Sequence, residues 1–133
     1  MDDLVTIDIN SNGVADVRLN RADKYNALSP AMFDAIIEAG ESLLDDKSVR
    51  AVVLSGNGRG FCAGLDFSGF RGMAGDAEGS PVISGRKPTG NIPGNAAQQS
   101  GMVWKSVPVP VIAAVHGVAF GGGLQIVMGA DIR

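Results

Sequence analysis

Two glycine-rich loops contain the residues whose types and spacing could support chemistry. The first covers residues 56–66 (GNGRGFCAGLD) and the second covers residues 116–125 (HGVAFGGGLQ). Each loop follows a short stretch rich in branched apolar residues, at 49–54 and 111–115, and such stretches are typical of buried strands. Glycine lets backbone N–H groups approach a ligand without interference from a Cβ atom. The loops therefore indicate a site that uses main-chain donors.

Main-chain donors suit an anion, or an oxygen that becomes one during a reaction. A helix that begins near Gly122 would add its unpaired N–H groups and about half a positive charge. Two convergent N–H donors would form an oxyanion hole, and removing one such donor typically costs about 2.7–4 kcal/mol of transition-state stabilisation. The alternative is that these glycines only form tight turns, and residue types alone leave both interpretations open.

Other glycine and metal motifs fit less well. A Walker loop needs Lys and Ser/Thr after its last glycine, where this chain has Gly123 and Leu124. Residues 58–63 match a degenerate dinucleotide fingerprint, but a glycine-rich stretch replaces the helix and strand that should follow. A Rossmann-type nucleotide-binding module is thus a weaker alternative. The one histidine, His116, and the one cysteine, Cys62, lack clustered partners, so no metal site is predicted.

The elements that must position the loops follow from periodicity. Residues 5–9 and 15–19 alternate apolar and polar side chains, which predicts two half-buried strands on one face of a sheet. Matching their apolar faces leaves residues 11–13 as a three-residue loop. Ser29 is an N-cap and Pro30 the first residue of an amphipathic helix of about four turns. Two units of strand, glycine-rich loop and helix follow.

The stretch between the two loops is unusual in composition. Residues 66–101 contain eight glycines and three prolines with almost no apolar periodicity. We expect residues 67–101 to form a mobile loop segment, either a flexible surface excursion or a lid. A short helix around residues 96–107 is predicted to return the chain to the core, with Trp104 packed inside.

Composition and charge limit the class of protein. The 133 residues, 45% of them apolar and 19% charged, fit a globular chain with an excess of glycine. The net charge of −3 offers no broad cationic surface, so nucleic acid is not an expected partner.

A charge-free stretch between Lys105 and Asp131 is long enough to cross a bilayer. The glycines at 121–123 would weaken a membrane helix, so a buried strand, loop and helix is predicted, and no membrane partner is expected. The single cysteine and the acidic start without a signal peptide favour a cytoplasmic protein.

Three segments in order resemble the crotonase family of enoyl-CoA hydratases and isomerases. They are residues 20–29 (NRADKYNALS), residues 61–66 (FCAGLD) and residues 110–123, which end in the glycine triplet. The resemblance implies an α/β fold, a crotonase-like spiral of repeated β-β-α units, of which this chain would form the N-terminal portion only. Residues 1–133 would be the N-terminal part of an acyl-CoA-binding core, completed by further chain or by another subunit.

The resemblance also implies roles for individual residues. The two oxyanion donors would be the N–H groups of Leu65 and Gly122, which would hold the thioester carbonyl oxygen as it becomes an enolate. The residues expected around the nucleotide and pantetheine of coenzyme A are Lys24, Tyr25, Ala27, Ala63, Gly64 and Asp66. Asp66 has an alternative role as the N-cap of a following helix.

Gln125 departs from the pattern of the family. Hydratases carry a glutamate at this position, and a glutamine amide cannot accept and return a proton as that carboxylate does. Isomerases vary here and take acid–base residues from the second half of the fold. Gln125 could still orient water or substrate by hydrogen bonding. We expect His116 and Cys62 to have structural roles.

The sequence thus predicts an acyl-CoA-processing enzyme of the enoyl-CoA hydratase/isomerase type. The alternatives are an enoyl-CoA double-bond isomerase without hydratase activity, and an acyl-CoA-binding protein without turnover. No permanently bound cofactor is expected, because coenzyme A arrives as part of the substrate. The resemblance further implies a homotrimer or hexamer.

Overall fold

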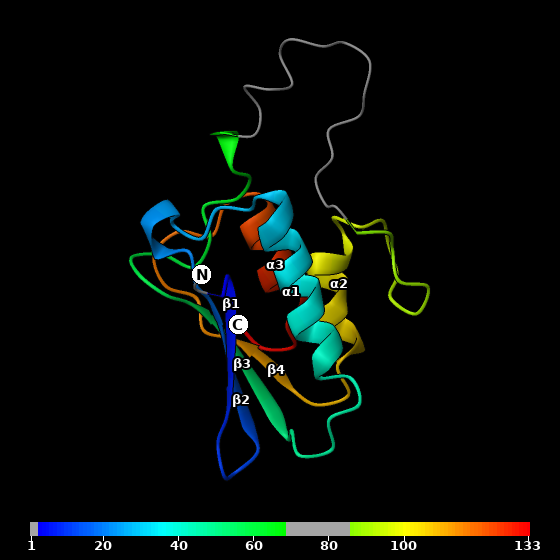
Figure 1. Ribbon diagram of the computed structural model, residues 1–133. Coiled ribbons are helices and arrows are strands. Elements are labelled where there is room, and N and C mark those ends of the chain that lie inside the picture. Colours follow the sequence, from blue (N-terminus) through cyan, green and yellow to red (C-terminus); the bar gives the residue numbers. More distant parts are fainter. Residues whose placement is uncertain (1–2, 69–85) are drawn as a thin grey trace.

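The computed structural model describes residues 3–68 and 86–133, and its strands and helices lie in these ranges. Three helices cover one face of a four-stranded sheet (Figure 1). The elements in chain order are β1 (Val5–Ile9), β2 (Val14–Leu19), the 3-10 helix η1 (Ala22–Lys24), α1 (Pro30–Ser42), β3 (Ala51–Gly56), α2 (Gln99–Ser106), β4 (Val111–Ala113) and α3 (Gly122–Gly129).

The sheet has the strand order β1-β2-β3-β4. Strands β1 and β2 are antiparallel with Ile9 opposite Ala15, so the predicted register and three-residue loop are confirmed. In that loop Gly13 has φ 81°, a left-handed conformation that favours glycine. Strands β2, β3 and β4 run parallel, and their carboxyl ends therefore lie at one edge, where the two glycine-rich loops begin.

The core lies between the sheet and the helices. Ala15, Val17 and Leu19 of β2 are fully buried on the helix-covered face. On β1 the equivalent side chains of Ile7 and Ile9 are each 37% exposed, more than expected for a half-buried strand. β1 is an edge strand, with β2 beside it on one side only.

Helix α1 begins and packs as its sequence predicts. The Oγ of Ser29 accepts a hydrogen bond from the N–H of Met32 at 3.2 Å, and Pro30 occupies the first turn. Met32 and Ile36 are completely buried against the sheet and the other helices. The sequence alone thus predicted both the start of this helix and its buried face.

The predicted mobile segment is described only in part, since residues 69–85 lie outside the described residues. After them, Arg86 contacts Glu38 at 2.8 Å and Glu41 at 2.6 Å on α1. The hydroxyl of Thr89 donates to Glu41 at 2.6 Å. These contacts attach the second part of the segment to α1, and the mobility of residues 67–101 stays a prediction.

Helix α2 confirms the predicted return to the core, because Trp104 is only 1% exposed. It packs against both α1 and α3 (Figure 1). The charge-free stretch forms β4, a loop and α3, as predicted. None of the helices formed by residues 3–68 and 86–133 is long and apolar enough to cross a membrane.

Candidate active site

The two glycine-rich loops lie side by side at the carboxyl edge of the sheet. The N–H of Phe61 donates to the carbonyl of His116 at 2.9 Å, and the N–H of Cys62 donates to Val118 at 3.0 Å. In return, the N–H of Phe120 donates to the carbonyl of Cys62 at 3.0 Å. Three main-chain hydrogen bonds therefore set the register of one loop against the other.

Beyond this ladder, the loops border one cavity of about 600 Å³. Leu65, Gly122 and Gln125 all line it, together with Ala63 and Gly64. Other lining residues are Phe33, Phe67, Asn95, Ala97, Gln98, Phe120 and Gly121. The structure thus places both predicted oxyanion donors and the predicted catalytic position in the same cavity.

The N–H groups of Leu65 and Gly122 are the two predicted oxyanion donors. Leu28 pairs with the neighbours of Leu65, because its N–H donates to Gly64 at 2.7 Å and its carbonyl accepts from Asp66 at 3.0 Å. Within the described residues, the N–H groups of Leu65 and Gly122 donate no hydrogen bond. Gly122 begins α3, whose first N–H groups lack helical partners and favour negative charge.

Gly64 allows the first loop to approach the second. It has φ 86°, and a Cβ atom there would lie 2.8 Å from the carbonyl oxygen of Phe120. Any larger residue would therefore separate the loops and move the N–H of Leu65 relative to Gly122. The glycine is required by both backbone conformation and space.

The cavity is mainly apolar, and its few polar side chains are not ionisable. Its polar side chains are the amides of Asn95, Gln98 and Gln125, and no lining residue in the described ranges carries a titratable group. These residues can polarise and orient a bound molecule through hydrogen bonds. They cannot supply the general acid or base that proton transfer requires.

The residues predicted to contact coenzyme A are divided between the cavity and its surroundings. Ala63 and Gly64 line the cavity, whereas Lys24 and Tyr25 lie outside its lining, at the exposed end of η1. The N–H of Ala63 donates to the carbonyl of Tyr25 at 2.9 Å, which joins this segment to the cavity wall. Ala27 is 9% exposed and is also outside the cavity lining.

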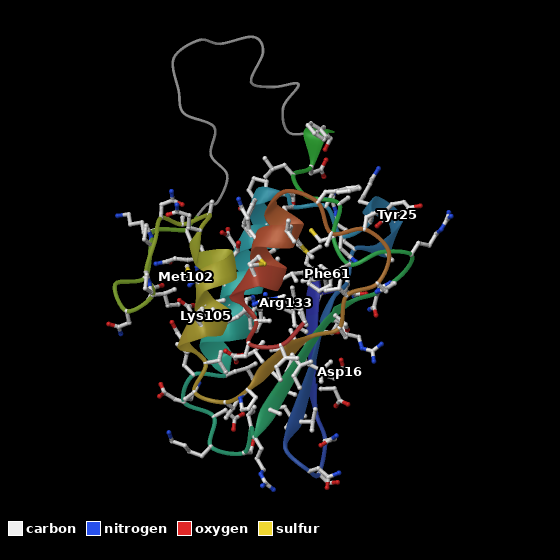
Figure 2. The ribbon with its side chains drawn as sticks, turned by 180° about the vertical axis from the view of Figure 1, so that it is seen from behind. Asp16, Tyr25, Phe61, Met102, Lys105 and Arg133 are labelled. Atoms are coloured by element: carbon white, nitrogen blue, oxygen red, sulfur yellow. The ribbon has the colours of Figure 1, made fainter. Side chains whose placement is uncertain are left out.

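Tyr25 adopts φ 50° and has Arg59 over its ring, with the guanidinium carbon 5.9 Å from the ring centroid. Figure 2 shows Tyr25 on the opposite side of the molecule from Met102 and Lys105 of α2.

Asp66 is fully engaged by neighbouring groups. Its Oδ1 accepts from the N–H of Ser68 at 2.9 Å and from the Ser68 hydroxyl at 2.6 Å. Its Oδ2 accepts from Nη1 of Arg21 at 2.6 Å. The hydrogen bonds from Ser68 and from Arg21 lower the pKa of this carboxyl to about 2. The bonds to Ser68 are those of an aspartate that begins a turn. The helix that Asp66 was predicted to cap would extend into residues 69–85, outside the described residues, so that role stays a prediction.

Asn26, which has no role predicted from the sequence, holds the first glycine-rich loop in place. It is completely buried, and its Nδ2 lies 3.0 Å from the carbonyl of Asn57, 3.1 Å from Gly60 and 3.0 Å from Phe61. Its Oδ1 accepts from the N–H of Arg21 at 2.8 Å. The signal for this role in the sequence was the position of Asn26 inside residues 20–29, the first of the three segments that resemble the crotonase family.

His116 and Cys62 lie outside the cavity lining. His116 is exposed, and its Nε2 is 2.8 Å from the carbonyl oxygen of Gly58, to which it donates. Cys62 is buried and its thiol donates to the carbonyl of Asn26 at 3.1 Å, while burial raises the pKa of the thiol. Among the residues of both described ranges, no group of three His, Cys, Asp or Glu side chains could hold a metal ion.

The geometry and the motifs agree with a comparison against known families. Residues 9–133 match the family described as enoyl-CoA hydratase/isomerase, and the chain belongs to this family. The predicted α/β, crotonase-like fold and the predicted family are therefore confirmed, with the chain covering the N-terminal portion of that fold.

Individual relatives include both hydratases and isomerases by name. The chain is 35% identical to human mitochondrial Delta(3,5)-Delta(2,4)-dienoyl-CoA isomerase, over 90% of this chain and 36% of that protein. It is 33% identical to mouse mitochondrial methylglutaconyl-CoA hydratase, over 92% of this chain and 36% of that protein.

Among solved structures, an enoyl-CoA hydratase of Mycobacterium smegmatis matches 98% of this chain and 46% of its own, at 34% identity and a TM-score of 0.76. The chain thus spans less than half the length of each of these three proteins.

Proposed function

We propose that this chain supplies the oxyanion hole of an acyl-CoA-processing enzyme of the enoyl-CoA hydratase/isomerase type. The observation that carries the proposal is the pair of N–H groups, of Leu65 and Gly122, that border one cavity and donate no hydrogen bond within the described residues. A thioester carbonyl oxygen bound between them would be stabilised as it gains negative charge. Each such donor typically contributes about 10²–10³ in kcat.

The proposed chemistry passes through an enolate of the thioester. In hydration, the oxygen of water bonds to the β-carbon and a proton is added to the α-carbon. In isomerisation, one carbon loses a proton and another gains one as the double bond moves. Both reactions place negative charge on the same carbonyl oxygen, so the two donors serve either of them. Gln125 would orient water or substrate through its amide.

The proposed substrate is an acyl-CoA thioester, with no permanently bound cofactor. Lys24, Tyr25 and Ala27 are proposed to lie near the nucleotide, and Ala63 and Gly64 near the pantetheine arm. The hydrogen bond between Ala63 and Tyr25 supports this arrangement, since it joins the two groups of residues directly.

A homotrimer or hexamer and a cytoplasmic location are further parts of the proposal. Exposed apolar side chains support an association of subunits, among them Leu124 and Met128, which are 50% and 52% exposed on α3. Light scattering of the full chain measures the oligomeric state, and a monomer would contradict this part. Cell fractionation measures the location.

The central test gives the full chain a 2-enoyl-CoA substrate and follows the products. A 3-hydroxyacyl-CoA product supports hydration, whereas a shifted double bond without hydration supports the isomerase. The absence of titratable side chains among the described lining residues keeps a second candidate in view, a protein that binds acyl-CoA without turnover. Deuterium exchange from solvent at the α-carbon would contradict that candidate, and tight binding without exchange would contradict the enzyme.

A further inference from the structure

The direction of the Leu65 N–H depends on how the chain is held on both sides of it. In a parallel β-bridge, one residue forms hydrogen bonds with the two residues that flank its partner. The partner's own N–H points away from that residue. Leu28 bonds in this way to Gly64 and Asp66. The N–H of Leu65 therefore faces the cavity only while this bridge is in register.

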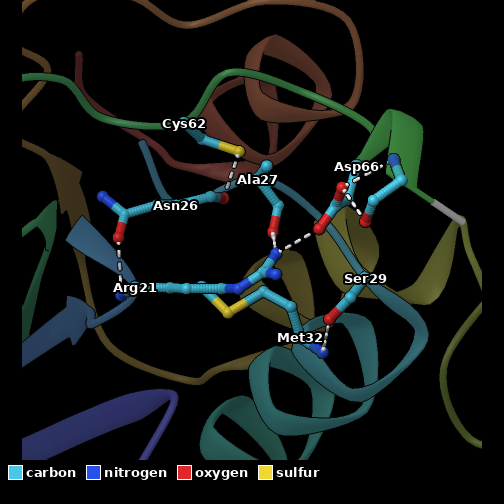
Figure 3. Close-up of polar contacts among 8 residues, drawn as sticks. Arg21, Asn26, Ala27, Ser29, Met32, Cys62 and Asp66 are labelled. Atoms are coloured by element: carbon cyan, nitrogen blue, oxygen red, sulfur yellow. Dashed lines mark hydrogen bonds and ion pairs between the residues drawn. The ribbon is translucent and has the colours of Figure 1, made fainter. Parts of the chain in front are cut away.

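One side chain contacts both segments of the bridge. Nη1 of Arg21 donates to Oδ2 of Asp66 at 2.6 Å and to the carbonyl of Ala27 at 3.0 Å (Figure 3). Asp66 follows Leu65, and Ala27 precedes Leu28, so the guanidinium joins the residues next to the bridge on each strand. The Arg21 and Asp66 side chains are 22% and 12% exposed, and neither residue lines the cavity.

The surroundings of this ion pair hold it in one arrangement. The backbone N–H of Arg21 donates to the buried amide of Asn26, which fixes the start of the side chain. The second oxygen of Asp66 is occupied by Ser68. A partly buried pair that is hydrogen-bonded at both ends has fewer alternative geometries than an exposed one.

We propose that Arg21 and Asp66 are positioning residues that aim the N–H of Leu65 at the substrate carbonyl. This inference rests on the proposed function of the cavity as an oxyanion hole. The ion pair acts through the Leu28–Leu65 bridge. The carboxylate of Asp66, which the family resemblance placed near coenzyme A, is occupied by Arg21 and Ser68 in place of a substrate contact. A misplacement of about 1 Å at a reacting centre can cost about 10²-fold in rate.

The test measures kcat and KM of the full chain for its acyl-CoA substrate in Asp66→Asn and Arg21→Gln. Each substitution should lower kcat by about 10- to 100-fold and change KM less than about threefold. Arg21→Lys should recover part of kcat, because an ammonium can reach Asp66 but lacks the planar fork of guanidinium. The double variant should cost little more than either single variant, since both remove one interaction.

The chain offers a matched control. Arg18 and Asp16 form an ion pair of the same 2.6 Å length on the open face of the sheet, where their side chains are 50% and 35% exposed. Arg18→Gln should leave kcat and KM unchanged. Equal loss of kcat in Arg18→Gln and Arg21→Gln would overturn the proposal, and so would a large rise in KM with kcat unchanged, which would indicate substrate binding by Arg21.

A spectroscopic measurement separates positioning from loss of folding. Binding between two N–H donors should shift the ultraviolet absorption of a dienoyl-CoA thioester, and Asp66→Asn should reduce that shift while circular dichroism stays native. If the wild-type chain binds no acyl-CoA, the proposed function fails. The NMR amide signal of Leu65 in the free chain then tests the positioning alone, and an unchanged signal in Asp66→Asn would overturn it.

Discussion

Gln125 lies in the first turns of α3 and borders the cavity that contains the two donor N–H groups. Its amide can orient a water molecule but cannot take and return a proton. We therefore expect Gln125→Glu to raise the rate of hydration of a 2-enoyl-CoA by at least about tenfold. A fully positioned general acid or base typically contributes about 10²–10⁴-fold, and the new carboxylate should supply part of that gain. The rate of 3-hydroxyacyl-CoA formation by the full chain measures this gain.

The control for this prediction is Gln98→Glu, which places a carboxylate on α2's side of the same cavity. It should not reproduce the gain, because a proton-transfer group must reach the reacting carbons and not only the cavity. An equal gain from both substitutions would mean that charge alone, and not position, raises the rate.

The lowered pKa of Asp66 predicts how the stability of the folded chain changes in acid. Hydrogen bonds from Ser68 and the guanidinium of Arg21 lower its pKa to about 2, below the ordinary value of about 3.9. A carboxyl whose pKa is lower in the folded state contributes stability above its unfolded pKa, and loses it as pH falls towards the folded pKa. The wild type should therefore exceed Asp66→Asn in free energy of unfolding at pH 6, and this difference should shrink between about pH 4 and pH 2.

Urea unfolding at pH 6, 4 and 2 measures that difference. Asp8→Asn is a suitable control, since within the described residues the Asp8 carboxylate forms no hydrogen bond or ion pair. If the difference between wild type and Asp66→Asn stays constant across this range, the ion pair does not contribute through its charge.

At the scale of elements, α2 and α3 lie in close contact at two glycines, Gly101 and Gly129. A Cβ atom on Gly129 would overlap the carbonyl oxygen of Gly101, which is backbone and cannot turn aside. Gly129→Ala should therefore destabilise the chain by about 1–3 kcal/mol, the usual range for overpacking. The thermal midpoint measured by circular dichroism should fall by several degrees.

Gly90→Ala is the matched control for the helix contact, because a Cβ atom there would meet no atom within 4 Å. It should change the stability by less than about 0.5 kcal/mol, as surface substitutions usually do. A similar loss in both variants would show that the close approach of α2 and α3 is not the cause.

At the scale of the whole molecule, Trp104 reports on cooperative folding. It is the single tryptophan of the chain and is 1% exposed, on the helix that packs against both α1 and α3. Its fluorescence should shift to longer wavelength on unfolding, at the same urea concentration as the loss of circular dichroism. An earlier fluorescence transition would mean that α2 leaves the core before the sheet unfolds.

The sequence by itself determined the local elements and the character of the donor loops. The β1–β2 register follows from period-two alternation, and the start of α1 follows from Ser29 and Pro30, because these signals lie within a few residues. The resemblance of residues 61–66 and 110–123 to one family correctly predicted the fold and the pair of loops.

Only the tertiary structure decided how these elements make a site. Leu65 and Gly122 border one cavity because the parallel order of β3 and β4 brings their following loops into register. Arg21 reaches Asp66 across 45 residues of sequence, and Asn26 reaches the carbonyl of Phe61 across 35. Local periodicity reports which side chains are buried, but contacts between distant residues depend on sheet order and packing, which no short window of sequence contains.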